Sequence, residues 1–233
     1  MSNPALSPSA PHTPVTQPSL AAARKARFWD RIARKYATDP ICDIAGYETS
    51  IQRVKGLLST EHDVLEIGSG TGTIALRLAP FARRYRATDL SAEMIAISQE
   101  KLAATPTPQL SFEVADADVE IVPPGSQDVV IAFSVLHLVD DLDHTLALAL
   151  RALRPGGLLL AKTPCVGQMN PLITHLALPI ARALGKAPQV SCFKAPDLEA
   201  AMVRQGFEMI SVERHGTTKS KDFRVFTIAR KPT

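Results

Sequence analysis

The sequence is poor in cysteine, and this shortage excludes two kinds of small-protein scaffold. Its three cysteines, Cys42, Cys165 and Cys192, lie far apart and form neither a CxxC pair nor a Cys/His pattern. We therefore expect neither a disulfide framework nor a zinc site. The acids Asp140 and Asp141 with Asp143 fit the start of a helix better than a metal site, because helix N-termini attract negative charge.

Long apolar runs and strong net charge are also missing. No stretch approaches about 18 uninterrupted apolar residues, and the N-terminus lacks the basic and apolar regions of a secretion signal. We therefore expect a soluble, cytoplasmic protein. The net charge of +3 is too small to indicate a nucleic-acid partner, which requires a clustered basic face.

The N-terminal part of the chain divides into a tail and a helical segment. Residues 1–20 contain five prolines among Ser, Thr and Ala, a composition that predicts a disordered tail. Residues 21–36 and 44–58 have helical spacing of apolar residues, so residues 21–60 are expected to be helical.

The first of these helices is basic and carries Phe28 and Trp29. Such a helix can cover a pocket, dock as an ordinary helix with solvated charges, or lie on an anionic membrane surface. The sequence leaves these alternatives open. It thus allows peripheral contact with the inner membrane through residues 21–36.

A strand followed by a glycine turn organises the rest of the chain. Residues 63–67 form an apolar run typical of a buried parallel strand, and helical spacing resumes at Thr73. Glycine in the turn allows positive φ angles and lets a ligand lie against bare backbone. The amide groups at the start of the following helix then face that ligand.

Strands and helices alternate along residues 61–233, which we expect to form one domain. Apolar runs indicate five strands of parallel type and a C-terminal antiparallel hairpin, at residues 63–67, 85–90, 110–115, 127–133, 158–162, 207–214 and 223–229. The predicted fold is α/β, a doubly wound Rossmann-like sheet of about seven strands with helices on both faces. A helical insertion over about residues 168–190, apolar at 172–184, is expected to wall a pocket.

Polar residues of interest follow the predicted strands, where ligands of such sheets bind. Glu66, Asp89 and Asp116 stand at the ends of the first three strands, and Ser134 and His137 follow the fourth. Asp89 comes 19 residues after Gly70, where a carboxylate can accept both ribose hydroxyls. Glu66 places a carboxylate where it would attract the ammonium of a methionine group.

The glycine turn alone is compatible with nicotinamide, flavin or S-adenosylmethionine. A dinucleotide fingerprint requires Gly or Ala at its sixth position, where this chain has Thr73. A P-loop requires a Gly-Lys-Ser/Thr end, which is absent. S-adenosylmethionine is therefore favoured over a nicotinamide cofactor.

Five motifs in order resemble class I S-adenosylmethionine-dependent methyltransferases, and within them the branch similar to ubiquinone and menaquinone C-methyltransferases. They are EIGSGTG at 66–72, DLS at 89–91, VADA at 114–117, FSVLH at 133–137 and LRPGG at 153–157. Residues 28–36 resemble the N-terminal lid of that family, although Ala37 stands where an acid commonly follows. The cofactor contacts that the resemblance implies are Tyr36, Glu66, Gly68, Ser69, Gly70, Gly72, Asp89, Leu90, Met94, Asp116, Ala117 and Ser134.

Methyl transfer from a sulfonium requires alignment and exclusion of water, with a base only where a proton leaves. His137 is the best candidate base, and a structural histidine is an equal alternative. Cys165 lacks the companion motif of cytosine C5 methylation, so we interpret it as a core residue.

The leading hypothesis is methyl transfer to a small, apolar or aromatic acceptor, such as a quinone precursor or a lipid. Nucleic acid is not expected as a partner. A protein or nucleic-acid methyltransferase, or a non-catalytic protein that binds S-adenosylmethionine, remains the alternative. The acceptor atom and the oligomeric state stay open.

Overall fold

A computed structural model describes residues 19–168, 178–183, 187–216 and 224–233. Nearly all of the predicted tail at residues 1–20 lies outside the described residues. So does much of the predicted insertion at 168–190, of which helix α6 (Leu178–Ala183) is described.

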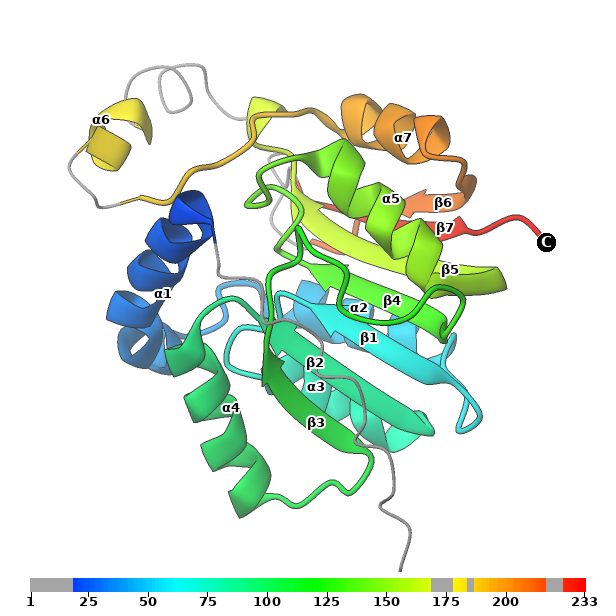
Figure 1. Cartoon of the computed structure of the whole chain (residues 1–233), viewed down its shortest axis with the longest axis horizontal. Helices are drawn as coiled ribbons and strands as arrows, with labels where there is room; N and C mark the ends of the chain where they lie inside the picture. The colour runs from blue at the N-terminus through cyan, green and yellow to red at the C-terminus, as the bar shows by residue number, and fades with distance from the viewer. Residues whose placement is uncertain (1–18, 169–177, 184–186, 217–223) are drawn as a thin grey trace, which may run out of the picture.

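A seven-stranded mixed sheet forms the centre of the molecule, in the order β3-β2-β1-β4-β5-β7-β6 (Figure 1). The strands are β1 (Asp63–Ile67), β2 (Arg84–Asp89), β3 (Leu110–Val114), β4 (Gln127–Phe133), β5 (Leu153–Pro164), β6 (Glu208–Glu213) and β7 (Arg224–Arg230). The first five pair in parallel, and β7 is antiparallel to both β5 and β6. The predicted doubly wound sheet with its C-terminal hairpin is confirmed.

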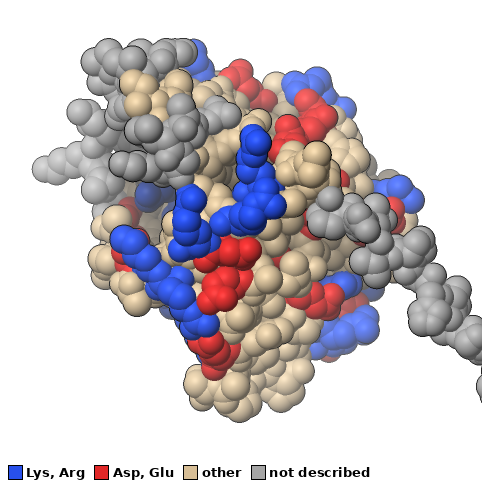
Figure 2. All heavy atoms as spheres, turned by 60° about the vertical axis from the view of Figure 1, so that its left-hand side comes forward, with Lys and Arg blue, Asp and Glu red and all other residues tan. Residues whose placement is uncertain are grey.

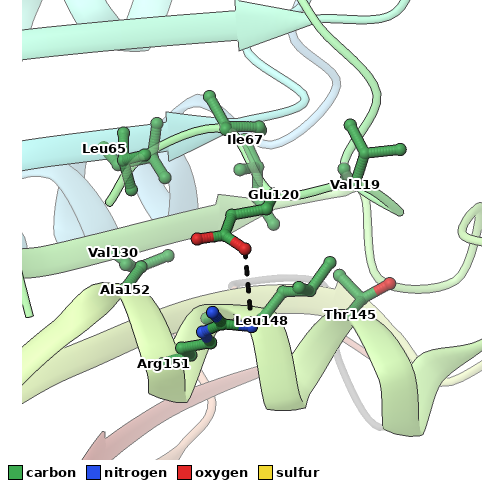
Figure 3. Close-up of a pocket in the computed structure, with 13 residues that line it drawn as sticks. Leu65, Ile67, Val119, Glu120, Val130, Thr145, Leu148, Arg151 and Ala152 are labelled. Carbon is green, nitrogen blue, oxygen red and sulfur yellow. Dashed lines mark ion pairs between the residues drawn. The ribbon is translucent and has the colours of Figure 1, made fainter. Parts of the chain in front are cut away.

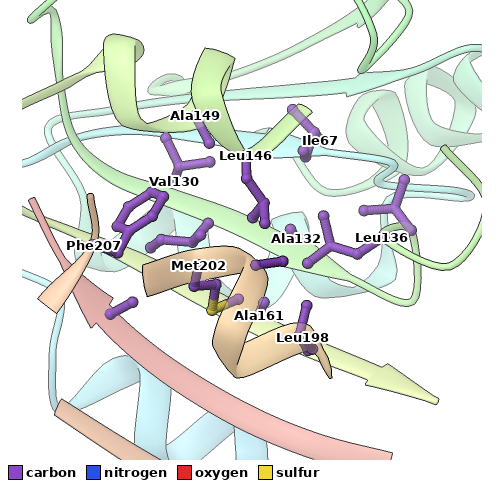
Figure 4. Packing of buried hydrophobic residues seen from close by; sticks show 14 of the residues in the cluster. Ile67, Val130, Ala132, Leu136, Leu146, Ala149, Ala161, Leu198, Met202 and Phe207 are labelled. Atoms are coloured by element: carbon purple, nitrogen blue, oxygen red, sulfur yellow. The ribbon is translucent and has the colours of Figure 1, made fainter. Parts of the chain in front are cut away.

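Side chains alternate between the two faces of the sheet, so each strand contributes to two cores. Leu65, Val130 and Leu159 pack with helices α5 (Leu142–Ala152) and α7 (Ala195–Arg204) in the cluster that Figure 4 shows. Val64 and Val129 pack on the opposite face, against α2 (Ile44–Lys55) and α3 (Thr73–Leu78).

Side-chain caps fix where several helices begin. Ser19 accepts from the Ala22 amide at the start of α1 (Leu20–Thr38), at 3.0 Å. Ser91 accepts from the Met94 amide at 3.1 Å and begins α4 (Ala92–Ala104). Asp141 accepts from the His144 amide at the start of α5, as expected for acids that open a helix.

Two element bounds differ from the prediction. α2 ends at Lys55 rather than at residue 58, because Gly56 caps it. β5 begins at Leu153 rather than at residue 158, so it includes the segment 154–157. The Lys231 amide donates to the Gly157 carbonyl and the Gly156 amide donates to the Lys231 carbonyl, each at 2.9 Å, so this segment is tied to the residue after β7 although Gly156 has a φ of 78°.

Helix α1 lies at one end of the sheet and packs against α4 (Figure 1). Trp29 packs with the buried Ala33, Met94 and Ile97, so this aromatic side chain of α1 is directed into the molecule. On the same side of the protein, Lys and Arg side chains lie next to Asp and Glu side chains (Figure 2). None of the described helices is both long and apolar enough to cross a membrane.

Candidate functional site

The glycine loop, residues 68–72, joins the end of β1 to the start of α3. Gly68, Gly70 and Gly72 have φ angles of 67°, 54° and 73°, in the left-handed region that favours glycine. The loop therefore depends on glycine at all three positions, as predicted.

Two of these glycines also lie too close to neighbours for a side chain. A Cβ on Gly68 would lie 2.5 Å from Val135, and one on Gly72 would lie 2.6 Å from Phe112. The neighbours come from the residues after β4 and from β3. Side chains from neighbouring segments thus pack directly against the loop backbone at Gly68 and Gly72.

Asp89 at the end of β2 is tied directly to the glycine loop. Its carboxylate accepts from the Gly70 amide at 2.8 Å and from the Ser91 amide at 2.9 Å. Burial raises the pKa of Asp89, and these two hydrogen bonds oppose the rise. Each carboxylate oxygen retains a lone pair for a further donor, so a pair of ribose hydroxyls can still be accepted.

Glu66 lies immediately before the loop and is 1% exposed. The Tyr85 hydroxyl donates to its carboxylate at 2.7 Å. Burial raises the pKa of Glu66 to about 7, with a smaller contribution from Asp89, while the Tyr85 hydrogen bond opposes the rise. A carboxylate buried without a positive partner is costly, so this position favours a cationic ligand.

The tips of β3 and β4 carry the remaining predicted polar residues. Asp116 accepts from the Asp118 amide at 3.1 Å, and Ala117 follows it in the same loop. Ser134 is exposed and has a φ of 55°, the one positive value among the described residues other than glycine. Its amide donates to the Lys162 carbonyl at 2.7 Å, which holds this uncommon conformation at the strand end.

Tyr36 on α1 reaches the glycine loop. A Cβ on Gly70 would lie 3.9 Å from the Tyr36 ring. Burial raises the Tyr36 pKa, and Asp89 adds to the rise. Tyr36 also contacts Trp29 edge to face at 6.2 Å between ring centroids. The structure thus brings α1, the glycine loop and the β2 tip together.

Sequence reasoning missed the polar contacts that place α1. Asp30 accepts from the Ser91 hydroxyl at 2.6 Å and from the Glu93 amide at 3.1 Å, at the start of α4. Lys25 pairs with Asp118 at 3.0 Å, in the loop that follows Asp116. The one signal in the sequence was that Asp30 is the only acid in a basic helix.

Met94 and Leu90 follow Asp89 but lie differently. Met94 is 2% exposed and packs beneath α1 with Ala33, whereas Leu90 is half-buried. Both therefore line the region between α1 and the β2 tip, where the resemblance places adenine.

His137 follows β4 and is partly buried. Its Nδ1 lies 3.3 Å from the Thr163 hydroxyl on β5. Burial lowers the pKa of His137 to about 4, so its imidazole is neutral at neutral pH. The side chain is thus able to accept a proton there.

Cys165 and His215 are accounted for by burial and by contacts within the protein. Cys165 is fully buried, and burial raises its pKa to about 11, which keeps it a thiol. His215 contacts Ser50 at 3.0 Å and Glu213 at 2.8 Å. His175 lies outside the described residues. Within the described ranges, no cluster of three or more His, Cys, Asp or Glu is placed to hold a metal ion.

A separate hollow lies beside the strands rather than at their tips (Figure 3). Its volume is about 370 Å³, including solvent at its mouth, and an ion pair of 3.4 Å between Glu120 and Arg151 crosses it. Leu65, Ile67 and Val130 line its apolar floor. The segment between β3 and β4, which contains no helix, contributes Ala117 and Val122 to its lining.

The glycine loop fits the amino-acid part of S-adenosylmethionine on three grounds. A Cβ position on Gly70 has only the Tyr36 ring within 4 Å, Asp89 is held against the loop, and the Ser69 hydroxyl is buried without a hydrogen-bond partner in the described part of the chain. When bound there, S-adenosylmethionine would supply an electrophilic methyl group. Glu66 and Asp89 would hold its charged and ribose groups.

The chain was compared with families and curated proteins. A family described as a methyltransferase domain matches residues 29–212. A protein named methyltransferase from Claviceps purpurea is 32% identical over 135 residues, covering 58% of this chain and 41% of that protein. A chondramide synthase of Chondromyces crocatus is 37% identical over 118 residues, covering 48% of this chain and 3% of the synthase. The chain thus spans less than half the length of either relative.

Solved structures share the fold. An N-methyltransferase of Haemonchus contortus, solved with phosphomonomethylethanolamine and S-adenosylhomocysteine, superposes with a TM-score of 0.69 and 21% identity. The alignment covers 89% of this chain and 60% of that one. At this identity the likeness shows the fold alone.

Proposed function

The chain belongs to the methyltransferase-domain family, and on this premise we propose that it transfers a methyl group from S-adenosylmethionine to a small, apolar or aromatic acceptor. The family match at residues 29–212 covers the greater part of α1 and the strands from β1 to β6, and it ends before β7. We also propose that it belongs to the branch similar to ubiquinone and menaquinone C-methyltransferases.

One observation carries the cofactor assignment to these residues. The Asp89 carboxylate accepts a hydrogen bond of 2.8 Å from the Gly70 amide, 19 residues earlier in the chain. This contact supports the proposal that Asp89 binds the ribose next to a loop whose backbone faces the methionine part. The α3 N-terminus adds amide groups that favour a carboxylate, which the methionine part carries.

The contribution of the chain to methyl transfer is then mainly alignment and exclusion of water. Tyr36 and α1 cover the glycine loop, while Asp89 and Glu66 fix the two ends of the donor. Positioning of this kind supplies a large share of the rate enhancement when both reactants are held in line. No covalent intermediate with the protein is needed.

We assign His137 as the base for acceptors that lose a proton. Its neutral imidazole lies at the tip of β4, on the same edge of the sheet as Asp89 and the glycine loop. A pKa of about 4 makes it a weak base, which suits an acceptor whose proton is already acidic.

Two features support a small acceptor over a macromolecule. One relative is named a chondramide synthase, and neither relative described above is named as acting on protein or nucleic acid. In addition, the positive charges of α1 are partly neutralised within the molecule, since Lys25 pairs with Asp118 and Arg34 pairs with Glu93 and Glu100. Contact of residues 21–36 with a membrane stays a prediction.

Calorimetric titration with S-adenosylhomocysteine tests the cofactor assignment. We expect binding by the native chain and a loss of at least about tenfold in Asp89→Ala, because hydrogen bonds to a charged group contribute about 1.5–3 kcal/mol. Glu113→Ala removes an acid near the end of the neighbouring strand β3 that pairs with Arg86 instead of the glycine loop, and it should leave affinity unchanged. No binding by the native chain, or equal loss in both variants, would contradict the assignment.

The acceptor is found by incubating the protein with methyl-labelled S-adenosylmethionine and a metabolite extract. A mass increase of one methyl group in a small molecule supports the proposal. Label in protein or nucleic acid favours the alternative classes, and binding without any transfer favours a non-catalytic protein. In the first case, His137→Asn should keep cofactor affinity and lower turnover by about 10²–10⁴-fold.

A further inference from the structure

Glu66 is a buried acid with too few partners. It faces the α2 and α3 side of the sheet, as Val64 does two positions earlier, and is 1% exposed. In the described part of the chain, no Lys or Arg forms an ion pair with it, and one hydrogen bond reaches it, from Tyr85. An ionised carboxylate in such surroundings needs further donors or a cation.

Tyr85 lies beside it on the adjacent strand. Glu66 pairs in register with Ala87, and Tyr85 stands two positions earlier on the same face of β2. Tyr85 is also 1% exposed, and burial raises the pKa of its hydroxyl well above the ordinary value. Its hydroxyl therefore stays a donor at physiological pH and directs one proton to Glu66 Oε2.

Among the residues that the structure describes, the other titratable groups near Glu66 supply no cation that pairs with it. Asp89 on β2 raises its pKa. Tyr47 on α2 has a buried hydroxyl without a hydrogen-bond partner in the described residues. Burial raises the pKa of Tyr47, Arg77 opposes the rise, and the charge of Glu66 adds to it. Arg77 itself pairs with Glu48.

We propose that Tyr85 is a positioning residue for the methyl donor: its hydroxyl orients the Glu66 carboxylate and favours its charged form, so that Glu66 receives the ammonium of the methionine part. Glu66 stands two residues before Gly68, where the methionine part is proposed to lie. A ligand ammonium supplies the positive charge and the donors that this pair lacks. The inference rests on the proposed cofactor.

The pair also makes donor binding depend on pH. A free-state pKa of about 7 means that Glu66 is half protonated near neutrality, and an ammonium stabilises its charged form. Binding of the ammonium therefore releases a proton. Affinity should rise with pH up to about 7 and level off above it.

Paired titrations with S-adenosylhomocysteine and with methylthioadenosine, which lacks the amino-acid part, test the inference. The titrations span pH 5.5 to 7.5. Below the pKa of Glu66, the affinity of the native chain for S-adenosylhomocysteine should rise about tenfold for each pH unit, whereas its affinity for methylthioadenosine should not change with pH. Tyr85→Phe should weaken S-adenosylhomocysteine about tenfold or more at pH 7 and leave methylthioadenosine unchanged. In Tyr85→Phe, the pH at which S-adenosylhomocysteine affinity levels off should be higher than in the native chain.

Two control variants sharpen the result. Glu66→Gln should abolish the pH dependence, and Tyr47→Phe should leave the midpoint where it is. The inference is overturned if Tyr85→Phe weakens both ligands equally, if Tyr47→Phe acts as strongly as Tyr85→Phe, or if the native affinity for S-adenosylhomocysteine is flat with pH. The last measurement needs no variant to fold. If the native chain binds neither ligand, the proposed function itself fails.

Discussion

At the scale of single residues, the glycine loop makes a steric prediction. Gly68→Ala should lower the free energy of unfolding by about 2–4 kcal/mol, because a positive φ costs about 1–2 kcal/mol and the new Cβ would lie 2.5 Å from Val135. Gly125 is the matched control, with a φ of 63° and nothing within 4 Å of an added Cβ. In chemical denaturation, Gly125→Ala should lower the free energy of unfolding only by the cost of the positive φ angle. Equal losses would contradict crowding at the loop.

His137 makes a prediction about acid stability. Its pKa falls to about 4 in the folded protein from an ordinary value of 6.5, so the unfolded chain binds more protons between these values. The contribution of the neutral His137 to the free energy of unfolding is present above pH 6.5 and is lost as the pH falls toward 4. The difference in unfolding free energy between the native chain and His137→Gln should shrink by up to about 3 kcal/mol over this range. Denaturant titrations from pH 7 to 4 measure it, and a constant difference would contradict the buried, neutral imidazole.

At the scale of elements, α1 should depend on Asp30 for its place over the site. Asp30→Ala removes two hydrogen bonds to the α4 N-terminus, so amide exchange across α1 should accelerate by about tenfold or more while exchange in β1 and β4 stays slow. Lys35→Ala loses only an exposed pair with Asp39 within α1 and should not change the exchange. Uniform acceleration across the sheet would show that Asp30 serves the whole fold instead.

Most elements were predictable because local chemistry determines them. Apolar runs marked the strands, glycines marked the loop after β1, and Ser91 marked the start of α4. β5 was predicted to start at residue 158, because Pro155 and Gly156 are local signals that end an element, whereas the backbone hydrogen bonds of Gly156 and Gly157 to Lys231 come from a distant part of the chain. The contacts of Asp30 and Lys25, and the Tyr85–Glu66 pair, join segments distant in sequence and have no local pattern.

At the scale of the whole molecule, the parallel strands bring their tips to one edge, so a ligand there should stabilise the entire domain. Saturation at 100 times the dissociation constant adds about 2.7 kcal/mol, which for a chain of this size corresponds to a rise in Tm of roughly 5–10 °C. We expect this rise with S-adenosylhomocysteine and none with NADH, in a thermal unfolding assay. An equal rise with NADH would favour a nicotinamide protein.

A crystal structure of the chain grown with S-adenosylhomocysteine tests the central claim most directly. We predict that the ribose hydroxyls lie on Asp89, the amino-acid part lies along residues 68–72, and the ammonium lies within hydrogen-bond distance of Glu66. Ligand density away from the tips of β1 and β2, or ribose hydroxyls that contact neither oxygen of Asp89, would contradict the account.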